Sequence, residues 1–108
     1  MKNYLLLYSG GKVPEGEAEQ VAVVKDWESW FARIGGALVD DGDPFLPVAK
    51  SIAADGTVSD GPAGSMASGY SILKADSLDA AVSMAKNCPV LKGRAKISVY
   101  VTFDARGM

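Results

Sequence analysis

A chain of 108 residues has the length of one ordinary domain, and we expect a single domain over residues 1–108. Its 11 basic and 13 acidic side chains give a formal charge of −2, which leaves no net positive charge to attract a nucleic acid. The sequence contains no histidine, and this excludes histidine-ligated zinc or haem sites and Ser–His or Cys–His nucleophile pairs. We therefore expect no metal, no cofactor and no nucleic-acid partner.

The single cysteine, Cys88, cannot close a disulfide within the chain. The N-terminus has no basic segment followed by a long apolar run, and the run Leu5–Leu7 is too short to cross a bilayer. These features predict a cytoplasmic protein without a membrane partner. We expect Cys88 to be buried and inert, because no basic neighbour is present to activate its thiol.

The first part of the chain predicts a strand and then a helix. Residues 3–8 (NYLLLY) form an apolar run that ends in Ser9-Gly10-Gly11, which is typical of a buried strand followed by a turn. After an acidic stretch at residues 15–19, apolar residues recur at spacings of three and four and predict an amphipathic helix that ends at Gly35-Gly36. The apolar residues of this helix are Val23, Trp27, Trp30, Phe31 and Ile34. We interpret its aromatic residues as core or interface packing.

The middle of the chain predicts an irregular arm. Residues 37–52 indicate a short strand, a polar turn at Asp40–Asp43 and an extended piece interrupted by two prolines, which belongs at a sheet edge. The segment DDGDP at 40–44 lacks the terminal glutamate of a calcium loop, so we expect a solvated turn. Asp55-Gly56 predicts a tight turn that returns the chain as a hairpin.

The last part of the chain repeats the strand–helix–strand pattern. Residues 69–75 (GYSILKA) predict a strand, and Asp76-Ser77 supplies an N-cap for a second helix that ends at Pro89. Residues 96–103 then alternate between polar and apolar side chains, which predicts a final strand with one apolar face. The apolar residues of that face are Ile97, Val99, Val101 and Phe103.

Two strand–helix–strand units of this length predict an α+β fold, a ferredoxin-like split βαβ sheet with two helices on one face. The apolar residues of the last strand would pack under the helices, while Ser98, Tyr100 and Thr102 would point to the uncovered face. An uncovered face of aromatic and polar residues is typical of a dimer surface or a ligand cleft. We therefore expect a homodimer.

Several segments together resemble the YCII-related family, in its DGPF-motif branch. The most specific are VSDGP at Val58–Pro62 and the run from Gly69 to Pro89, and the resemblance extends through MKNYLLLYSG, GALVDDGDPFLP and KISVYV. The resemblance implies a dimeric α+β barrel, in which two such sheets face one another around a cleft. This sequence differs from the family pattern at three places. Ala63 follows Asp-Gly-Pro, small residues occupy 64–68, and Lys25 or a neighbour stands where one branch of the family carries a histidine.

The candidate site residues are Asp60 and a weaker set on the predicted strands and first helix. Asp60 would act as an acid/base or anchoring carboxylate at the mouth of the cleft, although its side chain would also suit a turn in which it bonds to nearby backbone N–H groups. The weaker, substrate-binding candidates are Tyr4, Tyr8, Tyr70, Tyr100 and Lys25. The predicted function is a small-molecule binding protein or enzyme that uses the cleft, and the alternative is a non-catalytic dimerisation or regulatory module.

Overall fold

The computed structural model describes residues 1–11, 14–104 and 106, and this part of the chain forms two β–α–β units joined by a hairpin. The first unit consists of β1 (Lys2–Ser9), α1 (Gly16–Ile34) and β2 (Leu38–Asp40). The hairpin consists of β3 (Lys50–Ile52) and β4 (Val58–Asp60), and the second unit of β5 (Ala67–Ala75), α2 (Leu78–Ala85) and β6 (Lys96–Val101). Neither helix combines the length and the apolar composition that crossing a membrane would require.

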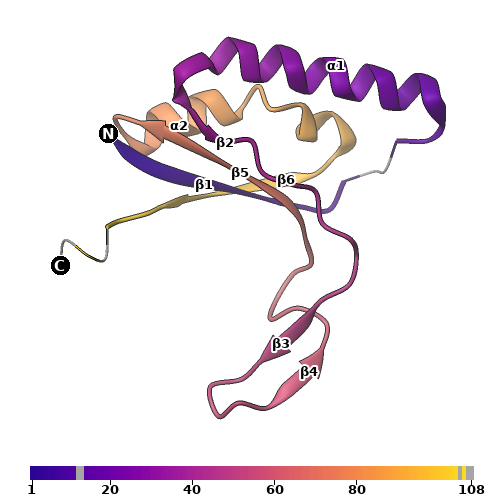
Figure 1. Ribbon diagram of the computed structural model, residues 1–108, viewed down its shortest axis with the longest axis vertical. Coiled ribbons are helices and arrows are strands. Elements are labelled where there is room, and N and C mark those ends of the chain that lie inside the picture. Colours follow the sequence, from indigo (N-terminus) through magenta and orange to yellow (C-terminus); the bar gives the residue numbers. More distant parts are fainter. Residues whose placement is uncertain (12–13, 105, 107–108) are drawn as a thin grey trace.

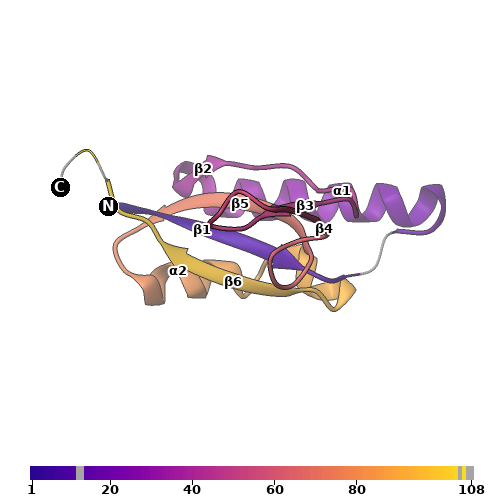
Figure 2. The same cartoon turned by 90° about the horizontal axis from the view of Figure 1, so that it is seen from below.

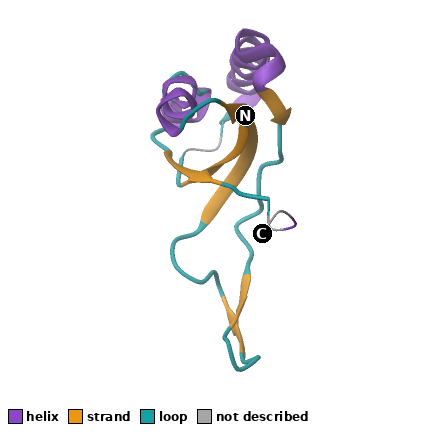
Figure 3. Ribbon diagram, turned by 90° about the vertical axis from the view of Figure 1, so that its left-hand side faces the viewer, coloured by secondary structure: helices purple, strands orange, loops and turns teal. Residues whose placement is uncertain are grey.

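Four strands form one antiparallel sheet in the order β2-β5-β1-β6. Each β–α–β unit therefore places a strand of the other unit between or beside its own strands, which is the predicted split βαβ arrangement. Figures 1 and 3 show both helices on the same face of this sheet. In Figure 2, α1 lies toward the β2 side and α2 toward the β6 side. The predicted α+β, ferredoxin-like fold is confirmed.

The helix ends follow from local sequence. Gly35 ends α1 with a φ of 53°, a conformation that glycine adopts without a steric penalty, and its N–H bonds to the carbonyl of Phe31. The Ser77 hydroxyl accepts the N–H of Ala80 at 3.0 Å and caps α2, as predicted. These two caps fix the end of α1 and the start of α2.

The core lies between the sheet and the helices. Side chains alternate along β1, so Tyr4, Leu6 and Tyr8 are buried toward the helices while the residues between them face the other way. Trp30 of α1 and Leu73 of β5 complete the centre of this core, with 2% and 0% of their surface exposed. Full burial of one such large apolar side chain contributes about 1.5–3 kcal/mol to stability.

The last strand is shorter than predicted. Ile97 and Val99 pack against the core as expected, but Val101 and Phe103 are 48% and 68% exposed. Val101 is the last residue of β6, which lies at the edge of the sheet, and Phe103 lies beyond the strand. Both the N–H and the hydroxyl of Thr102 then bond to the carbonyl of Asn3. The prediction that Val101 and Phe103 lie under the helices is therefore wrong.

The hairpin β3–β4 stands apart from the main sheet. We call residues 46–66 the arm; Figures 1 and 3 show it extending away from the helices, past the uncovered face of the sheet. Its turn is the predicted one, with the N–H of Thr57 bonded to the Asp55 carboxylate and Gly56 at a φ of 90°. The arm nevertheless exposes large apolar side chains, namely Leu46, Val48, Ile52 and Val58.

Candidate functional site: a pocket beneath the first helix

A pocket of about 500 Å³ opens between the middle of α1 and the segment that leaves β2. Helix α1, the end of β1, the segment 41–44 and the start of β5 form its walls. Its described lining residues are Tyr8, Pro14, Val23, Val24, Trp27, Glu28, Phe31, Asp41, Gly42, Asp43, Pro44, Ser68, Gly69, Tyr70 and Val90. Most of this surface is apolar, which is typical of a small-molecule site.

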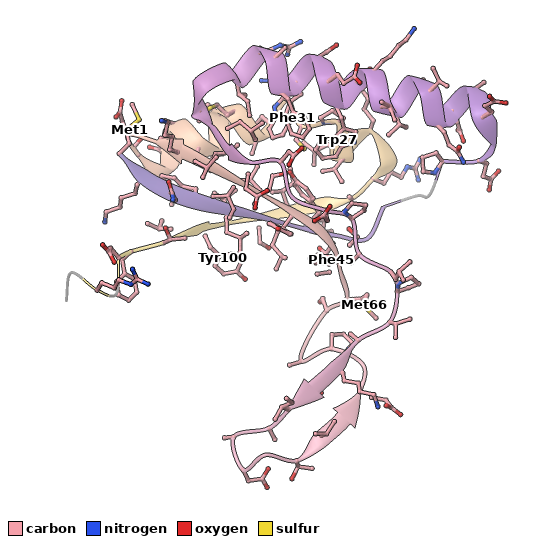
Figure 4. All side chains as sticks on the ribbon, viewed as in Figure 1. Met1, Trp27, Phe31, Phe45, Met66 and Tyr100 are labelled. Carbon is pink, nitrogen blue, oxygen red and sulfur yellow. The ribbon has the colours of Figure 1, made fainter. Side chains whose placement is uncertain are left out.

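Aromatic rings form the inner wall of the pocket. The ring of Trp27 meets Tyr8 edge-on at 5.7 Å between centroids and lies 5.6 Å from Phe31. Figure 4 shows Trp27 and Phe31 pointing from α1 toward the sheet. Behind them, Trp30 is buried and donates its Nε1–H to the carbonyl of Met84 at 3.1 Å, which holds α1 against α2. The wall is therefore a packed aromatic cluster with one side open to the pocket.

A chain of hydrogen bonds lies beneath the pocket, and we call it the floor; of its side chains, Tyr8 is the one among the described lining residues. The Cys88 thiol donates to the Tyr8 hydroxyl at 3.7 Å, the Tyr8 hydroxyl donates to Ser71 Oγ at 2.7 Å, and the Ser71 hydroxyl donates to the Asp41 carbonyl at 2.9 Å. Tyr8, Ser71 and Cys88 are all buried. These hydrogen bonds connect the segment after β2 to the core, because the last acceptor is the carbonyl of Asp41 in the pocket wall.

The floor groups stay protonated at neutral pH. Burial raises the pKa of Tyr8 above its ordinary value of 10.0, and burial likewise raises the pKa of the Cys88 thiol above 9.0. Neither group then supplies a phenolate or a thiolate, so neither is a base or a nucleophile in this state. This agrees with the expectation that Cys88 is buried and inert.

The acidic segment after β2 forms the outer wall. One oxygen of the Asp40 carboxylate accepts the N–H of Gly42 at 2.8 Å, and the other accepts the Tyr70 hydroxyl at 3.4 Å. The nearby Asp40 charge raises the pKa of Tyr70, with Asp43 and Asp41 adding to the effect. Only glycine fits at position 42, because a Cβ there would lie 1.8 Å from the Tyr70 carbonyl oxygen.

This segment is more than the solvated turn that the sequence predicts. Asp41, Gly42 and Asp43 line the pocket, and the Asp41 carbonyl is held by a buried hydroxyl. Among the residues that the structure describes, no three acidic or thiol side chains are placed to hold a metal ion together.

The structure brings two of the six predicted site residues into the pocket, Tyr8 and Tyr70. Tyr4 is buried in the core beside Ala75 and Ala81 and does not line the pocket. Figure 4 shows Tyr100 on the uncovered face of the sheet. Its side chain is exposed, at 54%. Lys25 is exposed on α1 and is absent from the lining.

Asp60 lies on the arm, at the end of β4. Its side chain is 92% exposed and its Oδ1 accepts a hydrogen bond from Lys50 Nζ at 2.8 Å. It is not among the residues that line the pocket. Its side chain does not fold back onto the N–H groups of its own turn either; the N–H of Gly61 bonds instead to the carbonyl of Ala49 at 2.8 Å. The turn interpretation is thus corrected to a cross-strand ion pair.

Sequence reasoning missed several pocket residues, namely Val23, Val24, Trp27, Phe31, Asp41 and Asp43 as lining groups. A signal was present for three of them, because Val23, Trp27 and Phe31 recur every four residues along one stripe of α1. Such a stripe predicts that this face of α1 contacts the rest of the molecule. The same spacing is expected for a fully packed helix face and for a pocket wall, so it does not distinguish the two.

Comparisons with known proteins support the fold. No family model matches the sequence, and no curated protein matches it. The structure is similar to 5-chloro-2-hydroxyhydroquinone dehydrochlorinase (TftG) from Burkholderia phenoliruptrix AC1100, solved in complex with 2,5-dihydroxybenzoquinone. The TM-score is 0.57, and the match covers 96% of this chain and 97% of that chain at 15% identity. At this identity the likeness concerns the fold.

Proposed function

We propose that this protein binds a small, flat and mainly apolar molecule in the pocket beneath α1. The observation that carries the proposal is that one chain already contains a pocket of about 500 Å³ with an aromatic wall. A pocket of that volume has room for a ligand of one or two rings, and aromatic side chains bind flat ligands by stacking and edge contacts. The ligand in the TftG structure, 2,5-dihydroxybenzoquinone, is a single ring, which supports a ligand of this size.

A reaction in this pocket would rely on carboxylates. The described lining side chains that could act as a base or anchor a ligand are Glu28, Asp41 and Asp43, since the Tyr8 hydroxyl already bonds to Ser71 and the chain has no histidine. An acid/base or anchoring role of Asp60 stays a prediction, and in this proposal it would reach a ligand from the arm of a second copy. Membership of the YCII-related family likewise remains part of the proposal, supported by the shared α+β fold.

A ligand screen with a matched pair of variants tests the binding function. Val24 lines the pocket and is 54% exposed, whereas Val21 lies one turn earlier on α1, is 49% exposed and is not a lining residue. We expect one-ring and two-ring aromatic compounds to raise the melting temperature of the wild type, because selective binding to the folded state stabilises it. Val24→Phe should abolish the shift by filling the pocket, while Val21→Phe should retain it. Equal shifts in the two variants would place the binding elsewhere.

The arm supports a second element of the proposal, association with another copy of this chain. A two-stranded hairpin is marginally stable alone. The arm that carries this one exposes Leu46 and Val48, each at 79%, and the uncovered sheet face has Tyr100 at its surface. A second copy that covers this face would bury both sets of side chains. This element also underlies the alternative function, a dimerisation module without catalysis.

Sedimentation velocity tests the association. Tyr100→Asp should shift the protein toward the monomer, because burying an unpaired carboxylate in an apolar interface is strongly unfavourable. Val21→Asp, on an equally exposed position of α1, should leave the mass unchanged. A wild-type protein that remains monomeric at every concentration rules out this element and leaves the pocket proposal standing.

A further inference from the structure

We propose that the pocket beneath α1 prefers aromatic ligands that carry an ammonium group and discriminates against aromatic carboxylates of the same size. This inference rests on the proposed binding function and names the class of ligand. It follows from three properties of the lining: its charge, its hydrogen-bond donors and its aromatic rings.

The charge of the lining is negative. Every charged side chain among the described lining residues is a carboxylate, and these are Glu28, Asp41 and Asp43. All three are exposed, so they lie at the rim, where they act on an entering ligand through solvent. Asp40 adds a further carboxylate next to this rim through its contact with Tyr70. An ammonium group at the rim is attracted by this field, and a carboxylate is repelled.

Several of the donors around the pocket are already used. The Tyr8 hydroxyl bonds to Ser71, and the Ser71 hydroxyl bonds to the Asp41 carbonyl. The N–H of Gly42 bonds to Asp40, and the N–H of Phe45 bonds to the Ser68 carbonyl at 2.9 Å. A ligand carboxylate that enters would lose its hydration without gaining these donors, which is unfavourable. A ligand ammonium can instead bond to the carboxylates of the lining, Glu28, Asp41 and Asp43.

The aromatic wall of the pocket also favours a ligand that carries a positive charge. The rings of Trp27, Phe31 and Tyr8 border the pocket, and the faces of such rings attract an ammonium group within about 6 Å. The ring of the ligand can pack against the same wall. One short ligand with a ring and an ammonium group therefore uses both the apolar wall and the acidic rim.

Three phenyl compounds of similar size separate charge from shape: 2-phenylethylamine, 2-phenylethanol and phenylacetate. We expect titrations followed by tryptophan fluorescence to give the tightest binding for the amine and the weakest for the acid, with about a tenfold ratio between them at low ionic strength. Added salt should reduce this ratio. The double variant Asp41→Asn/Asp43→Asn should reduce it several-fold, and Asp79→Asn, on the exposed first turn of α2, should leave it unchanged.

The outcomes separate this inference from the function on which it rests. Binding of phenylacetate as tight as that of the amine, or a ratio that the double variant does not change, overturns the charge preference and leaves the binding function intact. Absence of saturable binding for all three compounds up to millimolar concentration overturns both. Binding of the neutral alcohol alone supports the function and rejects the preference for a cation.

Discussion

Replacing Ser71 with alanine removes the hydroxyl at the centre of the hydrogen-bond chain beneath the pocket and breaks two hydrogen bonds. The Asp41 carbonyl belongs to an exposed residue and can bond to water instead, but the Tyr8 hydroxyl is buried, with 4% of the residue exposed. An unpaired buried donor destabilises a protein by about 1–3 kcal/mol, and we expect about 2 kcal/mol here. With an unfolding entropy of about 2.1 cal/mol/K per residue, the chain should lose about 9 °C in melting temperature.

Urea unfolding followed by circular dichroism measures this change, with several protein concentrations to expose any contribution from association. The double variant Tyr8→Phe/Ser71→Ala provides the control, because it removes the stranded hydroxyl together with its acceptor. It should be at least as stable as Ser71→Ala alone. A loss below about 0.5 kcal/mol for Ser71→Ala, or strict additivity of the two single changes, would refute the buried hydrogen-bond chain.

Three further predictions follow from named contacts. Burial raises the pKa of Tyr8 above 10.0, so its contribution is complete below pH 10 and is lost as the pH rises further, by at most about 1.4 kcal/mol per unit; Tyr8→Phe should show a shallower alkaline loss of stability in urea titrations. Gly42→Ala should destabilise the fold far more than Gly56→Ala, because both have positive φ but only the Gly42 Cβ would strike a backbone atom, and thermal melts of the two variants measure this. Asp60→Asn removes an exposed ion pair with Lys50 and should change the free energy of unfolding by less than about 1 kcal/mol, measured by urea unfolding. If the same variant loses ligand affinity while its stability is unchanged, Asp60 belongs to the binding site.

The sequence predicts most of the helices and strands because side-chain alternation, helical spacing and capping depend on residues that are close in sequence. The alternation in β1, the helical stripe from Val23 to Ile34 and the Ser77 cap each depend on residues close in sequence, and the structure confirms them. The end of β6 was mispredicted for a related reason. Its apolar alternation continues to Phe103, but β6 ends at Val101, opposite Tyr4, and an alternating pattern alone does not show where strand pairing stops.

The pocket depends on contacts between distant segments, and this is why the sequence does not reveal it. The wall at Asp41 is held by Ser71, thirty positions away, and the floor joins Tyr8 to Cys88 across eighty positions. Asp60 has the local signature of a functional turn, yet the arm carries it away from the lining residues. Motif reasoning found the tyrosines on the strands but had no means to tell which face each would occupy relative to the pocket.

The arm begins and ends at the pocket. The N–H of Phe45 bonds to the Ser68 carbonyl at 2.9 Å, and Pro44 forms a bridge with Gly69. Pro44, Ser68 and Gly69 also line the pocket, so the base of the arm and part of the wall are the same backbone. A ligand that favours one position of this backbone therefore biases the orientation of the arm, and by reciprocity anything that holds the arm changes ligand affinity by the same factor.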